Sequence, residues 1–110
     1  MAVNVSPTVT ALEAEAKASL FLSDHLPDRF TPGDPALQDG GALWRVPVLL
    51  AYPNIGPVGE VGEILVGART DGVVSHTATD EMLARARTLY NEHRDAIEAA
   101  AVVSVTGVNG

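Results

Sequence analysis

Residues 44–74 read WRVPVLLAYPNIGPVGEVGEILVGARTDGVV, and this stretch decides the fold. In its first part, apolar side chains recur at every second position, which is typical of a strand with one buried face. The face that we assign to the core consists of Trp44, Val46, Val48, Leu50 and Tyr52. Because Pro47 removes one ladder donor, we expect this strand to lie at a sheet edge or to carry a bulge there.

A segment rich in proline and glycine, residues 53–59, follows this strand and is too long for a two-residue hairpin turn. The alternation resumes from about residue 61 to residue 69, which predicts a second strand. The Asp-Gly pair in the turn at residues 70–72 is typical of a tight hairpin, and residues 73–76 form the predicted return strand. We therefore predict a three-stranded antiparallel meander.

Two helices are predicted on either side of this meander. Thr10 and Glu13 have the spacing of a capping box, so we expect a helix from near Ala11 to about His25, where Pro27 ends it. Residues 28–41 are dense in turn-forming residues and are predicted to be a loop without regular structure.

The second predicted helix follows the return strand. Thr77 or Thr79 is its expected cap, and Asp80 and Glu81 lie in its first turn, where negative charge favours the helix dipole. One apolar stripe runs along this helix, formed by Met82, Ala86, Leu89, Tyr90, His93 and Ile97.

The predicted fold class is α+β: an N-terminal helix, a three-stranded antiparallel β-meander and a C-terminal helix packed on the sheet. A chain of 110 residues has the usual length of one domain. We predict a single α+β domain over residues 11–100. Residues 1–10 are expected to be a flexible N-terminal tail, and residues 101–110 a C-terminal tail or an edge strand.

The charge balance limits the classes of partner. The chain has 14 acidic and 7 basic residues, which gives a formal net charge of -7. Such a chain repels nucleic-acid phosphates and anionic lipid surfaces within a Debye length of about 8 Å. We therefore expect no nucleic-acid partner and no membrane partner. No run approaches the ~20 apolar residues of a membrane span, and the first ten residues lack the positive charge of a signal peptide, so we predict a cytoplasmic protein.

The sequence contains no motif that indicates catalysis. Cysteine is absent. The three histidines, His25, His76 and His93, are residues of a type that can bind a metal ion or act as a general base, but no partner stands at a spacing that completes a metal site. Gly56, Gly59 and Gly62 recur at every third position without a helix after them, which argues against a phosphate-binding loop. We predict that the protein is not an enzyme and has no catalytic residues, metal site or cofactor.

The segment between the first two predicted strands has the strongest claim to a binding function. Its apolar groups stand where a turn usually carries polar ones, and an exposed apolar cluster often marks a partner surface. The candidate partner-binding residues are Tyr52, Asn54, Ile55, Pro57, Val58 and Glu60. The alternative is that Ile55 and Val58 fold back under the final helix as part of the core.

The quoted stretch also resembles a known family. Trp44-Arg45-Val46, followed by GEILVGARTDGVV at residues 62–74, is similar to the core of PepSY-type domains. The resemblance implies an initial helix, a strand that contains tryptophan, and a strand that ends in a Thr-Gly hairpin. It also implies that the protein restrains a peptidase or acts as an interaction module. This chain differs from the family in having Gly67 where an acidic residue is usual.

Three hypotheses about function follow. The first is a non-enzymatic module that binds another protein, or a second copy of itself, through the sheet face, an edge strand or the 53–60 loop. The second is an inhibitor or antitoxin-like regulator of a partner enzyme, whose negative charge would speed the encounter. The third is a binder of small ligands that uses the cleft between sheet and helices.

Overall fold

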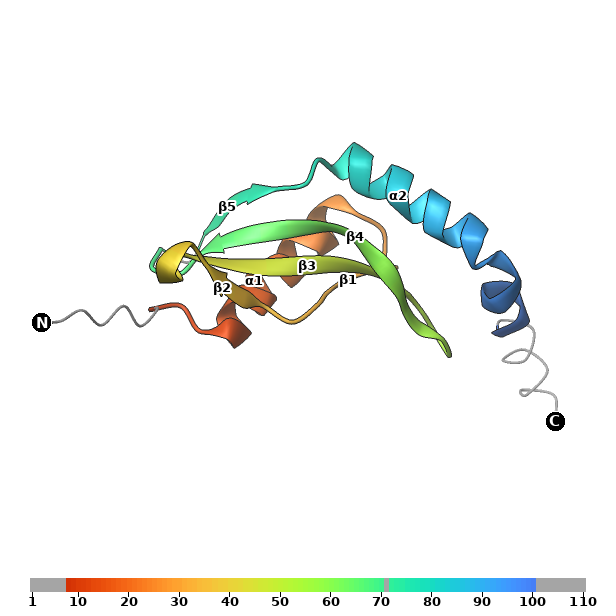
Figure 1. Cartoon of the computed structure of the whole chain (residues 1–110), viewed down its shortest axis with the longest axis horizontal. Coiled ribbons are helices and arrows are strands. Elements are labelled where there is room, and N and C mark those ends of the chain that lie inside the picture. Colours follow the sequence, from red (N-terminus) through yellow and green to blue (C-terminus); the bar gives the residue numbers. More distant parts are fainter. Residues whose placement is uncertain (1–7, 71, 101–110) are drawn as a thin grey trace, which may run out of the picture.

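The structure, a computed structural model, describes residues 8–70 and 72–100 and has an α+β fold (Figure 1). Helix α1 (Ala11–His25) precedes two short strands, β1 (Phe30–Pro32) and β2 (Ala36–Gln38), and the 3₁₀ helix η1 (Asp39–Gly41). The long strands β3 (Leu43–Tyr52) and β4 (Gly56–Gly67) follow, and then the short strand β5 (Val73–His76) and helix α2 (Thr79–Glu92). Residues 94–100 are again helical after a break at His93.

The strands form one antiparallel sheet with the order β1-β3-β4-β5, in which β2 also pairs with β3. The predicted meander is present as β3-β4-β5, but the prediction of three strands was wrong. Residues 28–41, expected to lack regular structure, contain β1 and β2, which pair with opposite halves of β3. Strands of three residues have too few positions for a period to be read, and here they form because β3 offers them an edge.

Pro47 lies in the middle of β3, neither at an edge of the sheet nor at either register shift of the β3–β4 ladder. Its carbonyl accepts a hydrogen bond from the Gly33 N–H at 2.7 Å, so its imide nitrogen faces the same side. That side holds residues 33–35, the connection between β1 and β2. The prediction of an edge or a bulge was therefore wrong, because the missing donor faces a gap between two short strands.

The capping box at the start of α1 is confirmed. The Thr10 hydroxyl accepts from Glu13 N–H at 3.1 Å, and the Glu13 carboxylate accepts from Thr10 N–H at 2.8 Å. Just before this cap, the Val9 N–H donates to the Ala68 carbonyl. The Val9 carbonyl in turn accepts a hydrogen bond from the Trp44 indole N–H at 2.7 Å. Val9, within the predicted N-terminal tail, is only 3% exposed. The rest of the predicted N-terminal tail, residues 1–7, and the predicted C-terminal tail or edge strand, residues 101–110, lie outside the described residues.

Neither predicted threonine caps α2. The residue at the cap position is Ala78, which makes no side-chain hydrogen bond there. The Thr77 hydroxyl instead accepts the Glu63 N–H at 3.0 Å and so ties the start of the helix to β4. The predicted apolar stripe of this helix is confirmed: Met82 is fully buried, and its other members are half-buried or buried.

Both helices lie on one face of the sheet. The alternation in β3 is confirmed, since Trp44, Val46, Val48 and Leu50 are buried and the residues between them are half-buried. On β4 the same face carries Gly62 opposite Val48 and Gly59 opposite Leu50. A Cβ atom at Gly62 would lie 2.8 Å from Met82 Cγ, and one at Gly59 would lie 2.9 Å from Leu89 Cδ1. Within the described ranges, no helix is long and apolar enough to span a membrane.

Candidate functional site

The predicted binding segment is mostly strand. Residues 53–55 form a three-residue turn, and β4 begins at Gly56, several residues before its predicted start. Left-handed backbone at Asn54 (φ 69°) and at Gly56 (φ 86°) makes this tight connection possible. The β3–β4 hairpin consequently extends to a narrow tip that projects beyond the rest of the sheet (Figure 1). A shaped loop over residues 53–59 was the wrong prediction, because pairing continues almost to the turn.

The six candidate residues do not gather on one surface. Asn54 and Pro57 are exposed, while Ile55 is half-buried. Val58 packs against the core, so the alternative of a core role holds for this residue. Tyr52 turns toward α2, and Glu60 belongs to a polar cluster on the face away from the helices. The structure thus distributes the predicted site over the hairpin tip, the core, the side that faces α2 and the polar cluster.

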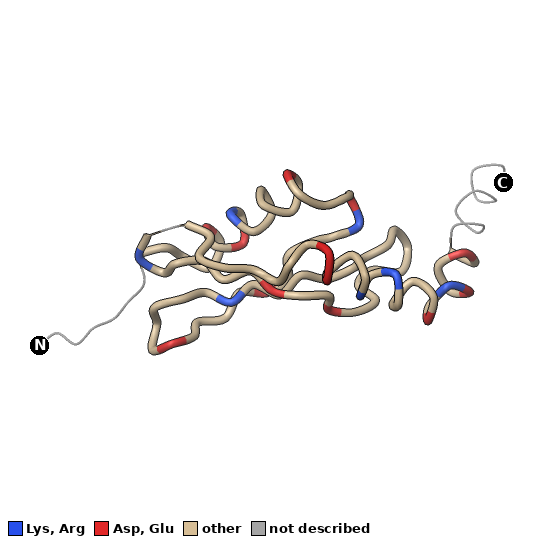
Figure 2. The backbone as a smooth tube through the Cα atoms, turned by 90° about the horizontal axis from the view of Figure 1, so that it is seen from above, with Lys and Arg blue, Asp and Glu red and all other residues tan. Residues whose placement is uncertain are grey.

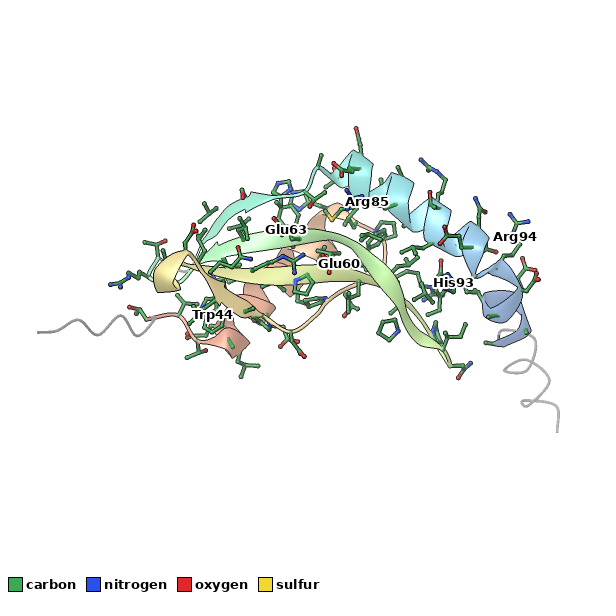
Figure 3. The ribbon with its side chains drawn as sticks, in the orientation of Figure 1. Trp44, Glu60, Glu63, Arg85, His93 and Arg94 are labelled. Carbon is green, nitrogen blue, oxygen red and sulfur yellow. The ribbon has the colours of Figure 1, made fainter. Side chains whose placement is uncertain are left out.

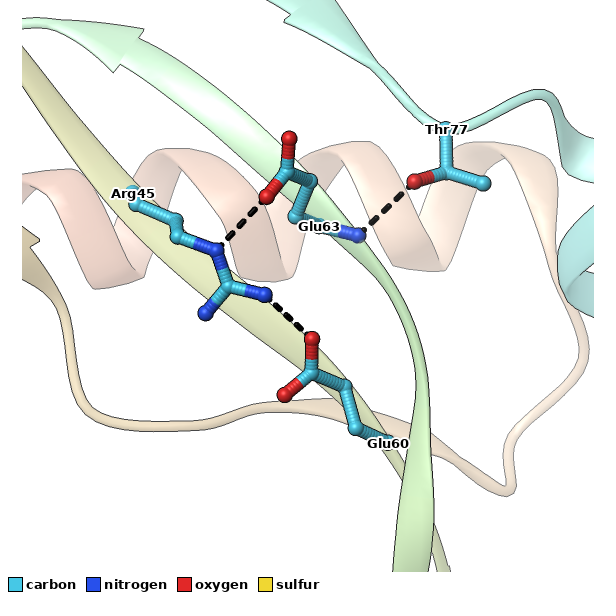
Figure 4. Close-up of polar contacts among 4 residues, drawn as sticks. All are labelled: Arg45, Glu60, Glu63 and Thr77. Carbon is cyan, nitrogen blue, oxygen red and sulfur yellow. Dashed lines mark hydrogen bonds and ion pairs between the residues drawn. The ribbon is translucent and has the colours of Figure 1, made fainter.

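The polar cluster joins β3 to β4 on the helix-free face (Figure 4). Arg45 Nε donates to Glu63 Oε1 at 2.6 Å, and the same guanidinium pairs with Glu60. The hydrogen bond to Glu63 raises the pKa of Arg45. All three side chains are partly exposed, and exposed ion pairs contribute about 0–1 kcal/mol each. The cluster keeps one cation paired with two carboxylates, which suits cross-strand alignment better than acid–base chemistry.

A cleft of about 280 Å³ opens where α2 passes the far end of β3, and we call it the tyrosine cleft. Its walls are largely apolar and include Phe30, Leu50, Leu83 and Ala86. Its rim carries two tyrosines and two arginines: Tyr52, Tyr90, Arg29 and Arg87.

The aromatic rings at this rim are held in place by specific contacts. The Tyr52 and Tyr90 ring centroids lie 6.2 Å apart at an interplanar angle of 49°. The Arg29 guanidinium carbon lies 5.5 Å from the Tyr52 centroid, within the range of a cation–π contact. The Tyr90 hydroxyl donates to Glu98 at 3.2 Å, and this hydrogen bond raises the pKa of Tyr90. Tyr52 is the one predicted site residue in the cleft.

Strand β5 forms an open edge of the sheet. All four of its residues are exposed, and Val73 and Val74 expose 37% and 58% of their surfaces. The strand contains neither a charged residue nor a proline. The short return strand at 73–76 is thus confirmed, whereas part of its turn, Asp71, lies outside the described residues.

The three histidines do not form a site together. His25 and His76 lie on the Phe21 ring at centroid distances of 4.2 and 4.4 Å. His93 lies apart from them, at the break after α2, at the opposite end of the molecule from Trp44 (Figure 3). Nδ1 of His93 bonds the Leu89 carbonyl at 3.0 Å. Over residues 8–70 and 72–100, no three potential ligands gather that could hold a metal ion.

Within the part of the chain that the structure describes, the charged residues also form no stripe of one sign. Figure 2 shows lysines and arginines spread along the described chain and interleaved with aspartates and glutamates. Sequence reasoning missed Arg45, Arg29 and Arg87 as site residues. Arg45 stands diagonally across the ladder from Glu63, a relation that becomes visible only once the register is known. Arg29 and Arg87 are far apart in the chain, and no local pattern joins them.

Comparison of the chain with protein-family models, with curated proteins and with solved structures finds no match in any of the three. The resemblance to PepSY-type domains therefore stays a prediction that rests on residues 44–74.

Proposed function

We propose that this protein is a non-enzymatic interaction module that binds an extended segment of a partner protein along strand β5. The observation that carries the proposal is the open, uncharged edge of the sheet, where every residue of β5 is exposed. A partner strand can add to such an edge through main-chain hydrogen bonds.

The backbone of β5 has hydrogen-bonding groups on its outer side. Thr77 N–H donates to the Glu63 carbonyl at 3.0 Å, and Ser75 pairs with Leu65 two residues along the same ladder. His76 lies between these two positions, so its N–H and C=O point away from β4. These groups are oriented to accept and donate in a ladder with an added strand.

The side chains of β5 favour the same use. Val73 and Val74 present an apolar surface at the edge. Edge strands are usually protected from pairing by a charged side chain, a proline or a bulge. Strand β5 has neither charge nor proline, although the register of its ladder with β4 shifts between Leu65 and Val66. The opposite edge contains Pro32 within β1 and Pro35 in the connection to β2. Of the two edges, β5 is therefore the better template for a new strand.

The charge of the chain indicates the chemistry of the partner. At a formal net charge of -7, this protein attracts a segment that carries lysine or arginine around an apolar centre. Two copies of the chain repel each other electrostatically, which makes a second copy the less favoured occupant of the edge. The proposed partner segment is thus extended, apolar where it meets the valines, and basic at its ends.

The test compares the wild type with Val74→Lys and Val74→Thr. Lysine at an edge position opposes strand addition and repels a basic segment, whereas threonine keeps the β propensity and adds no charge; both variants keep the backbone donor. Each protein is used to select binders from a library of displayed peptides, and amide hydrogen exchange then locates the surface that the binders protect. We expect basic, extended binders that protect residues 73–76 and that bind Val74→Lys at least about tenfold more weakly than the other two proteins.

Two results would contradict the proposal. One is a set of binders that recognise all three proteins equally or protect residues outside β5. The other is self-association of the purified wild type in light scattering with protection at residues 73–76, which would make a second copy the occupant.

A further inference from the structure

We infer that the tyrosine cleft binds a small organic acid, with an apolar or aromatic body and one carboxylate. This inference is independent of the proposed partner segment, because it concerns a different surface and a different class of ligand. The cleft lies between α2 and the strand ends at Phe30 and Tyr52, whereas the open edge lies at β5, on the other side of β4.

The volume of the cleft limits the size of its ligand. A volume of about 280 Å³ lies just below the roughly 300–1,000 Å³ of most small-molecule sites. A compact acid with a single ring or a short chain suits this volume better than a nucleotide or a larger cofactor does.

The walls select an apolar body. Leu50 forms part of the floor and is almost completely buried, so the floor belongs to the packed core. Leu83 and Ala86 project from α2 toward it, one turn apart, and Phe30 adds an aromatic wall from β1. Apolar surface of this kind binds a hydrocarbon or a ring by removing it from water. Tyr52 and Tyr90 add rings against which a planar group can pack.

The rim selects a negative charge. In the described part of the chain, Arg45 and Arg85 are neutralised by Glu60 and Glu63 and by Glu81, but no ion pair holds Arg29 or Arg87. Arg69 and Arg94 also have no ion pair within the described residues, but Arg29 and Arg87 are the two that line one opening. A planar guanidinium binds a carboxylate through paired, charge-assisted hydrogen bonds. The cleft therefore combines an apolar interior with cationic groups at its mouth, which is complementary to an amphipathic acid.

The experiment uses 3-phenylpropionate as the probe and 3-phenylpropanamide as its neutral counterpart. Both have the same ring and chain length, so the difference between them isolates the carboxylate. Binding to the full chain is measured by titration calorimetry, and the Tyr52 and Tyr90 ring resonances locate the site by NMR. We expect saturable binding of the acid, shifts of both rings, and binding of the amide at least about tenfold more weakly.

Three variants sharpen the assignment. Arg87→Gln removes an exposed cation at the rim and should weaken binding of the acid about tenfold without changing binding of the amide. Arg85→Gln is the matched control, because Arg85 lies on the same helix, is paired with Glu81 and does not line the cleft. Ala86→Phe fills the cleft from α2 and should abolish binding of both probes.

The inference is overturned if neither probe binds saturably or if acid and amide bind equally well. It is also overturned if Arg85→Gln weakens binding as much as Arg87→Gln does, because the effect would then reflect overall charge. Arg87 and Arg85 are both exposed, so folding of these two variants is not at risk and the comparison between them stays decisive.

Discussion

The two helices cover the same face of the sheet, but they pack against it differently. Beneath one helix the larger side chains come mainly from the sheet, and beneath the other they come from the helix. Beneath α1 the strands supply large residues such as Trp44 and Ile64, and two of the three buried residues of the helix, Ala14 and Ala18, are small; the third is Leu22. Both alanines are completely buried. Small residues on a helix allow it to approach a sheet closely, so this part of the core is tightly packed. We call it the sealed end.

Beneath α2 the arrangement is reversed. Strand β4 supplies Gly59 and Gly62, and the helix supplies Leu89 and Met82, whose side chains occupy the space that strand side chains would fill. Of the α2 residues between Thr79 and Glu92, Met82 alone is fully buried. Contact through a few long side chains holds the helix in place but leaves space beside it, and the tyrosine cleft lies there. The comparison teaches that one sheet face can carry both a sealed core and an open site.

The largest loss of unfolding free energy is expected for a substitution at the sealed end, beneath α1. Trp44→Ala removes the largest core side chain and leaves the Val9 carbonyl without its indole donor. A cavity of this size costs about 3–5 kcal/mol of unfolding free energy, a large share of the stability of a small domain. Equilibrium denaturation by urea measures the change. A loss below about 1 kcal/mol would show that the α1 end is not the tightly packed one.

The next largest loss of unfolding free energy is expected for a substitution that tests how tightly α1 packs against the sheet. Ala18→Leu introduces three carbon atoms where no exposed surface remains, and we expect it to cost about 1–3 kcal/mol through overpacking. Ala16→Leu is the matched control, since Ala16 is exposed on the same helix and the change there should stay within about 0.5 kcal/mol. Equal unfolding midpoints for the two variants would contradict the sealed packing.

A smaller loss of unfolding free energy is expected when a single methyl group is added beneath α2. Gly59→Ala places a methyl group 2.9 Å from the Leu89 methyl carbons, which are the free end of a flexible side chain. Because Leu89 is only half-buried and can rotate away, we expect a cost below about 1 kcal/mol, partly offset by the lower backbone entropy of the unfolded alanine chain. Thermal unfolding monitored by circular dichroism measures this change. A cost as large as that of Ala18→Leu would mean that the two ends are packed alike.

The polar cluster on the opposite face should contribute less still. A double-mutant cycle with Arg45→Ala and Glu63→Ala should give a coupling of about 0.2–1 kcal/mol, because both side chains are partly exposed to water. The coupling should decrease as salt is added. A coupling that exceeds this range and is insensitive to salt would indicate a desolvated pair.

The smallest effect concerns a pKa at the cleft. The hydrogen bond to Glu98 raises the pKa of Tyr90 above 10.0, so Glu98→Gln should lower that pKa toward 10.0. A raised pKa means that the folded state holds this proton more tightly than the unfolded state does. The associated stability is therefore present below pH 10 and lost as the pH rises through the folded-state pKa. Phenolate absorbance in a Tyr52→Phe background measures the titration of Tyr90. An unchanged pKa of Tyr90 in Glu98→Gln would show that the hydrogen bond to Glu98 does not raise it.

The sequence predicted those elements whose signals are local. The capping box at Thr10 and Glu13, the alternation from Trp44 to Leu50 and the stripe around Met82 each depend on neighbours along the chain, and each is confirmed. The strands β1 and β2 were missed because their three residues pair only after β3 has formed. The early start of β4 was missed because proline and glycine are typical of turns, although here they stand in a paired strand.

The candidate site was much less predictable than the fold. Tyr52 was recognised as a candidate, but its neighbours in the cleft, Arg29 and Tyr90, come from segments more than twenty residues away on either side. The register shifts in the β3–β4 ladder determine which residues near the tip face α2, and no local pattern encodes them.

By itself, the sequence determined the α+β class, the two long helices, the core face of β3 and the acidic charge, because periodicity, capping and composition act over short distances along the chain. Only the tertiary structure decided that both helices share one face, that β5 is left as an open edge, and that two arginines meet two tyrosines beside α2. These features arise from segments that are distant in the chain. They depend on glycines such as Gly62, whose missing side chain allows α2 to pack closely against β4.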